Sequence, residues 1–156
     1  VVGDDVVSGS NVAAWKSHEA NVTQKLQTDN PNEKIGGQVT LDVYGPDNKM
    51  LTIIPDNIYK SGDSYQIVDA KFSQSGKLAA GSLNGSLTPN QKDVYGWIKN
   101  GEVTNVVARG KNAEEFGLRR GVSINLTNQV QIAVNVIPSA QNFAIYGSSN
   151  ILIRNY

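Results

Sequence analysis

The spacing of apolar residues changes from helical to strand-like after about residue 30. Between Asn11 and Thr28 apolar positions recur every three or four residues, which predicts an amphipathic helix. Asp29-Asn30-Pro31-Asn32 has the composition that ends a helix. From Gln38 onward every second residue is apolar, a period typical of strands with one face in the core. The pattern therefore predicts one helix followed by a β-rich segment.

Two hairpins are predicted in this β-rich segment. We expect strands at 38–44 and 50–54, joined by the turn Gly45-Pro46-Asp47-Asn48. A second pair is expected at 57–59 and 65–72, joined by Ser61-Gly62-Asp63.

The second half returns to mixed signals. Residues 73–87, rich in Ser, Gly and Asn, predict a long loop. Thr88-Pro89-Asn90-Gln91 supplies an N-cap, a first-turn proline and a capping-box glutamine, so a helix should run to about Lys99 and end at Asn100-Gly101. A strand at 103–108, favouring a crossover onto the sheet, a short helix at 113–118 and strands at 122–126, 130–136 and 143–153 complete the prediction.

This order of elements predicts an α+β domain with a mixed central sheet flanked by helices. The 156 residues suffice for one domain with its own core, and we expect a single domain over 1–156 behind a flexible lead-in at 1–10. Because the chain starts with Val, we expect it to be part of a longer protein. No apolar run reaches the length of a membrane span, and no signal-peptide pattern is present.

Composition narrows the chemistry. The absence of cysteine excludes disulfides and thiolate metal ligands. A net charge of zero argues against a generic nucleic-acid binder, yet residues 1–71 carry 6 Lys/Arg and 10 Asp/Glu, whereas 72–156 carry 8 and 4. This division fits an acidic metal site in the first half and a phosphate-binding surface in the second, and it equally fits ordinary solvated charge.

One acidic pattern has a chemical interpretation. Asp69-Ala70-Lys71 ends the apolar run 65–68, and strand alternation puts Asp69 and Lys71 on the same face. Pro55-Asp56 ends an earlier apolar run, at hairpin distance. A carboxylate beside an ammonium suggests a metal ligand next to a charge-stabilising group. The alternative is a charged pair on an exposed strand edge, where it protects against aggregation.

The spelling PD…DxK resembles the PD-(D/E)xK nuclease superfamily, over roughly residues 11–108. The resemblance implies a restriction-endonuclease-like core, with 109–156 as a β-rich C-terminal extension. It implies that Asp56 and Asp69 bind a divalent cation (Mg²⁺, Mn²⁺ or Zn²⁺) and that Lys71 lies over the scissile phosphate. An acidic residue on the first helix often completes such a site, which implies Glu19 as a third metal ligand. The alternative for Glu19 is a partly buried carboxylate paired with a lysine.

Two further positions have competing interpretations. Gln91 and Tyr95 share one helix face and look like a Q-x3-Y motif found in branches of the superfamily, where the glutamine positions the metal-bound water or the nucleic-acid backbone. Gln91 would then join the catalytic set, but a capping box needs the same residue. His18, the only histidine, is expected at the surface rather than as a zinc ligand or base.

Basic residues of the second half are candidates for contacts to the phosphate backbone. Such contacts are salt-dependent and largely independent of sequence. The candidates are Lys77, Lys92, Arg119 and Arg120, together with Lys99, Arg109 and Lys111. The alternative for each is an ordinary surface residue.

The chain also resembles the C-terminal nuclease toxin domains of contact-dependent growth-inhibition (CdiA-type) proteins. That resemblance implies a metal-dependent DNase toxin, secreted or delivered from the cell surface as part of a larger protein. It would act in the target-cell cytoplasm and be blocked by a cognate immunity protein. Two alternatives stay open: an RNA or tRNA endonuclease on the same scaffold, and a non-catalytic β-rich binding module in which Asp-x-Lys is accidental.

Overall fold

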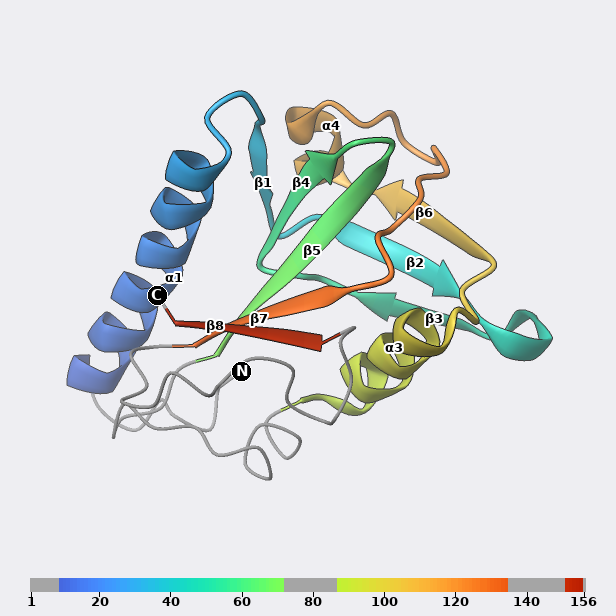
Figure 1. Cartoon of the computed structure of the whole chain (residues 1–156), viewed down its shortest axis with the longest axis horizontal. Coiled ribbons are helices and arrows are strands. Elements are labelled where there is room, and N and C mark those ends of the chain that lie inside the picture. Colours follow the sequence, from blue (N-terminus) through green and yellow to red (C-terminus); the bar gives the residue numbers. More distant parts are fainter. Residues whose placement is uncertain (1–8, 72–86, 135–150, 156) are drawn as a thin grey trace.

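Helices flank two open β-sheets in the computed structural model, which describes residues 9–71, 87–134 and 151–155 (Figure 1). The α-helices within these ranges are α1 (Gly9–Asp29), α3 (Pro89–Asn100) and α4 (Lys111–Phe116). The predicted α+β class is confirmed. None of these helices is long and apolar enough to span a bilayer. Helix α1 begins within the predicted lead-in, of which residues 1–8 lie outside the described ranges.

The larger sheet is mixed and has the strand order β1-β4-β5-β7-β8. Strands β1 (Ile35–Gly37), β4 (Asn57–Ser61) and β5 (Ser64–Lys71) are antiparallel neighbours. Strand β7 (Val130–Val134) lies parallel to β5, and β8 (Ile151–Asn155) lies parallel to β7. Strand β5 is therefore an interior strand of this mixed sheet.

The smaller sheet is antiparallel, with the order β3-β2-β6. It contains β2 (Thr40–Tyr44), β3 (Met50–Ile53) and β6 (Asn105–Arg109), and the 3-10 turn η2 (Pro46–Asn48) joins β2 to β3. The expectation of a single central sheet is therefore corrected. The chain bends between β1 and β2 at Gln38, whose φ is 55°, and β2 starts a second sheet. Strand β6 pairs with β2 there, instead of crossing over onto the sheet of β5.

The C-terminal strands also differ from expectation. Residues 109–156 were expected to form an extension, but β7 pairs directly with β5 inside the mixed sheet. The predicted strand at 122–126 makes only isolated bridges, at Ser123 and Leu126. The loop predicted at 73–87 and the strand starting at 143 fall mostly outside the described ranges.

Two apolar clusters form the core on opposite sides of β5. One joins β5, the smaller sheet and α3, and includes Leu41, Ile67, Val94, Ile98 and Ile132. The other packs Val22 and Leu26 of α1 against Tyr59, Val68, Ala70 and Ala133. Strand β5 is thus covered on both faces, so polar residues at its end lie inside the protein.

Candidate active site

Asp69 and Lys71 lie on the face of β5 opposite Val68 and Ala70. The two apolar residues pack beneath α1, while Lys71 reaches Gln91 on α3. Lys71 Nζ lies 3.3 Å from Asp69 Oδ2, and the two side chains are only 9% and 4% exposed. An interior strand and a buried ion pair exclude the interpretation of an exposed, charged strand edge.

Asp56 reaches the same place from the segment between β3 and β4. Its Oδ2 accepts a hydrogen bond from the backbone N–H of Ala70 at 2.8 Å. Its Oδ1 accepts one from Gln38 Nε2 at 3.0 Å. These two bonds hold the carboxylate beside Asp69-Ala70-Lys71, so the predicted meeting of the PD and DxK segments is observed.

Gln91 is the capping-box residue of α3, and it also contacts Lys71. Its Oε1 accepts a hydrogen bond from the N–H of Thr88 at 3.0 Å, and Thr88 Oγ1 accepts one from the N–H of Gln91 at 3.2 Å, which completes a capping box. The same Oε1 accepts a hydrogen bond from Lys71 Nζ at 3.3 Å. The start of α3 is thereby tied to the Asp69–Lys71 pair.

These groups line one cavity of about 290 Å³. Its walls include Trp15, Glu19, Ile54, Asp56, Asp69 and Lys71. A second cavity, of about 340 Å³, shares Glu19, Gln38 and Asp56 with it and also borders Lys16. Glu19 and Asp56 border both cavities, whereas Asp69 borders only the first.

The pKa values of the cavity reflect burial of several acidic groups together. Burial raises the pKa of Asp69 to about 7; the Lys71 ammonium opposes the rise, and the adjacent Asp56 carboxyl adds to it. Burial also raises the pKa of Glu19, against a lowering contact with Asp56. The buried Tyr95 hydroxyl, near Asp69, has its pKa raised mainly by burial and also by the charges of Asp69 and Asp56. Because the Asp56 and Asp69 carboxyl groups repel each other when both are ionised, a bound cation would favour the state in which both are charged.

The carboxylate oxygens of Asp56 and Asp69 are suitable ligands for a hard cation, but among the described residues the third expected ligand is missing. Asp69 Oδ2 is buried without a hydrogen bond, although Lys71 lies within ion-pair distance. Within residues 9–71, 87–134 and 151–155, no three His, Asp or Glu side chains are close enough to form a ready metal site. The expected three-carboxylate ligand set of Glu19, Asp56 and Asp69 is therefore not formed. One reason is that both Asp56 oxygens already accept protein hydrogen bonds. Two carboxylates still suffice for Mg²⁺, which keeps several waters.

No family model, curated protein or solved structure matches this chain. Its fold and site are therefore described from its own geometry.

His18 is buried, contrary to the expectation of a surface residue. It is 3% exposed and its Nε2 lies 3.2 Å from the carbonyl oxygen of Ala133. Burial lowers its pKa, against the raising effect of contacts with the backbone of Ala133 and Lys71. His18 thus connects α1 to the β5–β7 pair, one residue before Glu19.

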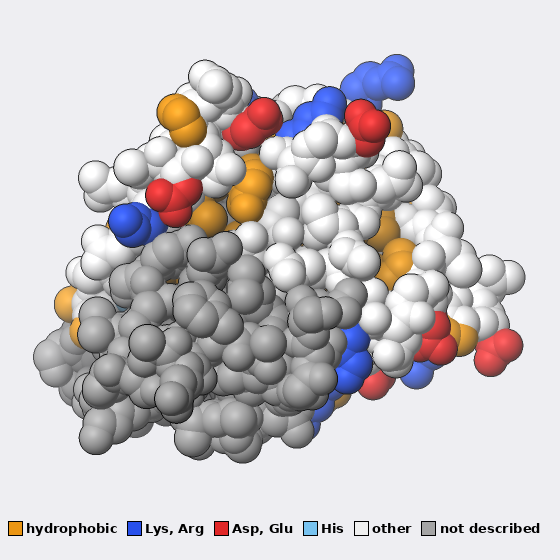
Figure 2. All heavy atoms as spheres, in the orientation of Figure 1, with side chains coloured by type: hydrophobic (Ala, Val, Ile, Leu, Met, Phe, Trp, Pro, Cys, Tyr) orange, Lys and Arg blue, Asp and Glu red, His pale blue; other side chains and the backbone are white. Residues whose placement is uncertain are grey.

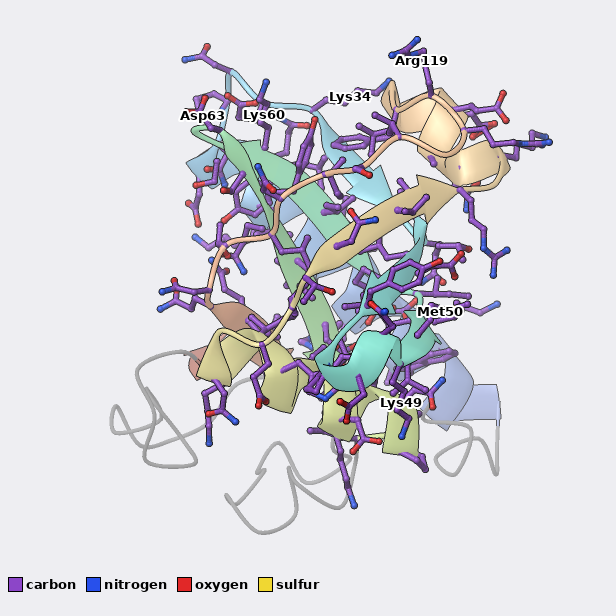
Figure 3. All side chains as sticks on the ribbon, turned by 90° about the vertical axis from the view of Figure 1, so that its right-hand side faces the viewer. Lys34, Lys49, Met50, Lys60, Asp63 and Arg119 are labelled. Carbon is purple, nitrogen blue, oxygen red and sulfur yellow. The ribbon has the colours of Figure 1, made fainter. Side chains whose placement is uncertain are left out.

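The predicted phosphate contacts are scattered. Lys92 is exposed on α3, next to Gln91. Arg119 and Arg120 follow α4, and Arg120 is paired with Glu114 at 3.8 Å. Figure 3 places Arg119 at the end of the molecule opposite α3. Lys77 lies outside the described residues. The face in Figure 2 shows basic and acidic side chains interspersed, without a broad basic area among the residues it colours.

Sequence reasoning did not place Gln38, Trp15 or Ile54 in the cavity. Gln38 donates a hydrogen bond to Asp56, and Trp15 and Ile54 are large apolar residues of the cavity lining. Gln38 follows two glycines at the start of an alternating run, which marks a bend but gives no indication of its partner. Ile54 lies only two residues before Asp56, so its closeness in sequence to a predicted site residue could have indicated that it lines the cavity.

Proposed function

We propose that this chain is a metal-dependent nuclease, a phosphodiester hydrolase with a restriction-endonuclease-like site and DNA as the preferred substrate. One observation carries the proposal: the hydrogen bond from the Ala70 N–H to Asp56, which brings two carboxylates and the Lys71 amine into one cavity. Charged residues of one hairpin converge there although burying them is costly, and such groups are typical of functional sites.

Asp56 and Asp69 would hold the cation, with Glu19 at the side of the same cavity. An all-oxygen donor set favours Mg²⁺ or Mn²⁺ over Zn²⁺. When bound, the cation would acidify a water molecule and neutralise charge on the phosphate.

Lys71 supplies the fixed positive charge. Its ammonium is held between Asp69 and Gln91, so it needs little reorganisation when charge develops on a phosphoryl oxygen. Gln91 acts through Lys71 and is therefore a positioning residue.

A cleavage assay tests the proposal. Supercoiled plasmid is incubated with the protein and Mg²⁺ or Mn²⁺, with and without EDTA, beside an RNA substrate. We expect cleavage that stops in EDTA and falls at least about 100-fold in Asp69→Ala and Lys71→Met. Asp63→Ala is the matched control, because Asp63 is exposed at the other end of the same hairpin (Figure 3). Cleavage that persists in Asp69→Ala would refute the assignment, and cleavage of RNA alone would replace DNase by RNase.

We further propose that this nuclease is a toxin domain of a contact-dependent growth-inhibition system, neutralised by an immunity protein. This second proposal rests on the first and on the resemblance to such toxin domains described for the sequence. Cytoplasmic expression of the parent chain should stop growth, whereas Asp69→Ala should not. Normal growth of cells that accumulate active parent protein would remove the toxin role.

A further inference from the structure

Two large apolar side chains line the cavity of the proposed active site. Trp15, half-buried on α1, and Ile54, which follows β3, line the cavity that holds Asp56, Asp69 and Lys71. Trp15 and Glu19 are four residues apart on α1, so the indole lies one helical turn from the Glu19 carboxyl. An aromatic ring and an aliphatic side chain therefore stand next to groups suited to a cation and a phosphate.

The exposure of Ile54 is unusual in this molecule. Among the described residues only Met50 and Ile54 are large apolar residues with high exposure, at 44% and 49%. A single exposed apolar residue needs no explanation, but one that shares a cavity with a tryptophan and buried acidic groups provides a surface for an apolar ligand. Met50 does not line this cavity.

A nucleotide carries a partner for both the charged and the apolar side chains of this cavity. In a nucleotide the charged phosphate and the flat, apolar base face are joined by one sugar, so a phosphate beside Lys71 brings a base close by. Base stacking on aromatic side chains strengthens binding with little dependence on base identity. In an intact duplex both faces of a base are stacked and unavailable.

We propose that Trp15 and Ile54 form a stacking subsite for an unpaired base next to the scissile phosphate, so that the substrate is single-stranded or locally unpaired nucleic acid. This inference rests on the proposed function, because the same cavity is used.

The subsite is tested by binding in EDTA, with tryptophan emission and anisotropy as readouts. The ligands are a thymidine 12-mer, an abasic 12-mer with the same phosphates, and a 12-base-pair duplex. We expect the parent to bind the thymidine strand about tenfold or more tightly than the abasic strand, with quenching that is lost in Trp15→Phe. The other tryptophan, Trp97, packs over Gly45, where an added Cβ would collide with its ring.

Substitutions at Trp15 and Ile54 distinguish a loss of base stacking from a loss of folding. Trp15→Ala should bring affinity for the thymidine strand down to that for the abasic strand, and Trp15→Leu retains bulk if the alanine variant fails to fold. Ile54→Ser should weaken binding about threefold, whereas Met50→Ser, an equally exposed change nearby, should not. Equal affinity of the parent for the thymidine and abasic strands, tightest binding of the duplex, or equal losses in the two serine variants would overturn the inference.

The two proposals can fail separately. Base-dependent binding through Trp15 without cleavage by any metal would support the subsite and remove the nuclease. Metal-dependent cleavage abolished by Asp69→Ala but unchanged by Trp15→Leu and Ile54→Ser would keep the nuclease and remove the subsite.

Discussion

Two aspartates show how environment sets the chemistry of a carboxyl group in this protein. Asp69 is buried near Asp56, and its pKa is raised to about 7. Burial would also raise the pKa of Asp42, but hydrogen bonds from Arg109 and Thr52 outweigh that effect and lower it. The first carboxyl is suited to exchanging a proton for a cation, whereas the second stabilises the folded chain.

The metal-free protein should become more stable when the Asp69 charge is removed. The folded pKa of Asp69 exceeds the unfolded value, so its contribution to stability is complete below about pH 4 and is lost as pH rises to about 7, at a rate of order 1 kcal/mol per pH unit. We expect Asp69→Asn to reduce this loss and to be the more stable protein at pH 8. Urea unfolding in EDTA at pH 5 and pH 8 measures both effects.

Asp42→Asn is the opposing control. Its folded pKa is lowered, so its stabilisation is present above the unfolded pKa and lost as pH falls through the folded one. Because Arg109 is half exposed, Asp42→Asn should lower the free energy of unfolding at pH 7 by less than about 1 kcal/mol. A loss of stability at pH 8 in Asp69→Asn would contradict the account of Asp69.

At the scale of elements, local signals predicted the helices better than the sheets. The capping box at Thr88 and the left-handed Gly101 bound α3 as expected. Alternation showed which residues of β5 share a face but not which strands pair with it. The parallel pairing of β5 with β7 depends on contacts between segments more than sixty residues apart. Strand β1 has only three residues, two of them glycine, and was not predicted.

The spacing of apolar residues in α1 left open which residue continues the buried face toward the N-terminus. Val22 and Leu26 are buried, and the stripe could continue through Glu19, three residues earlier, or His18, four residues earlier. The structure buries His18 and leaves Glu19 half-buried, since a neutral imidazole costs less to bury than a carboxylate. Asp56, Asp69 and Lys71 could be predicted because each ends an apolar run, whereas Gln38 and Trp15 join them only through the tertiary fold.

The two contacts of Gln91, with Thr88 and with Lys71, predict a difference between two variants of one cap. Thr88→Ala and Gln91→Ala each remove a capping-box hydrogen bond, so each should lower the free energy of unfolding by about 1 kcal/mol. Only Gln91→Ala also removes the contact with Lys71, so only this variant should lose cleavage rate, by about tenfold. Urea unfolding and the plasmid assay measure the two effects. Equal activity in the two variants would reduce Gln91 to a cap residue.

At the scale of the whole molecule, charge is balanced and locally dispersed. The net charge is zero; Lys92 follows the cavity residue Gln91 on α3, while Arg119 lies at the opposite end of the molecule. Electrostatic attraction to nucleic acid should therefore be modest.

Salt dependence tests this distribution. Lys92→Ala should reduce the slope of log affinity against log salt by about one unit, as expected for one lost phosphate contact. The double variant Arg119→Ala/Arg120→Ala serves as control and should leave the slope unchanged. The measurement is anisotropy of a labelled strand from 50 to 300 mM salt, about the range in which such slopes are resolved. A larger change in the double variant would move the nucleic-acid path to α4.

The most direct test of the central claim is a Mn²⁺ soak of crystals followed by anomalous scattering. The account predicts a single strong peak between the Asp56 and Asp69 carboxylates, at about 2.0–2.6 Å from their oxygens. The peak should be lost in crystals of Asp69→Asn. No peak at saturating Mn²⁺, or a peak held by other residues, would contradict it.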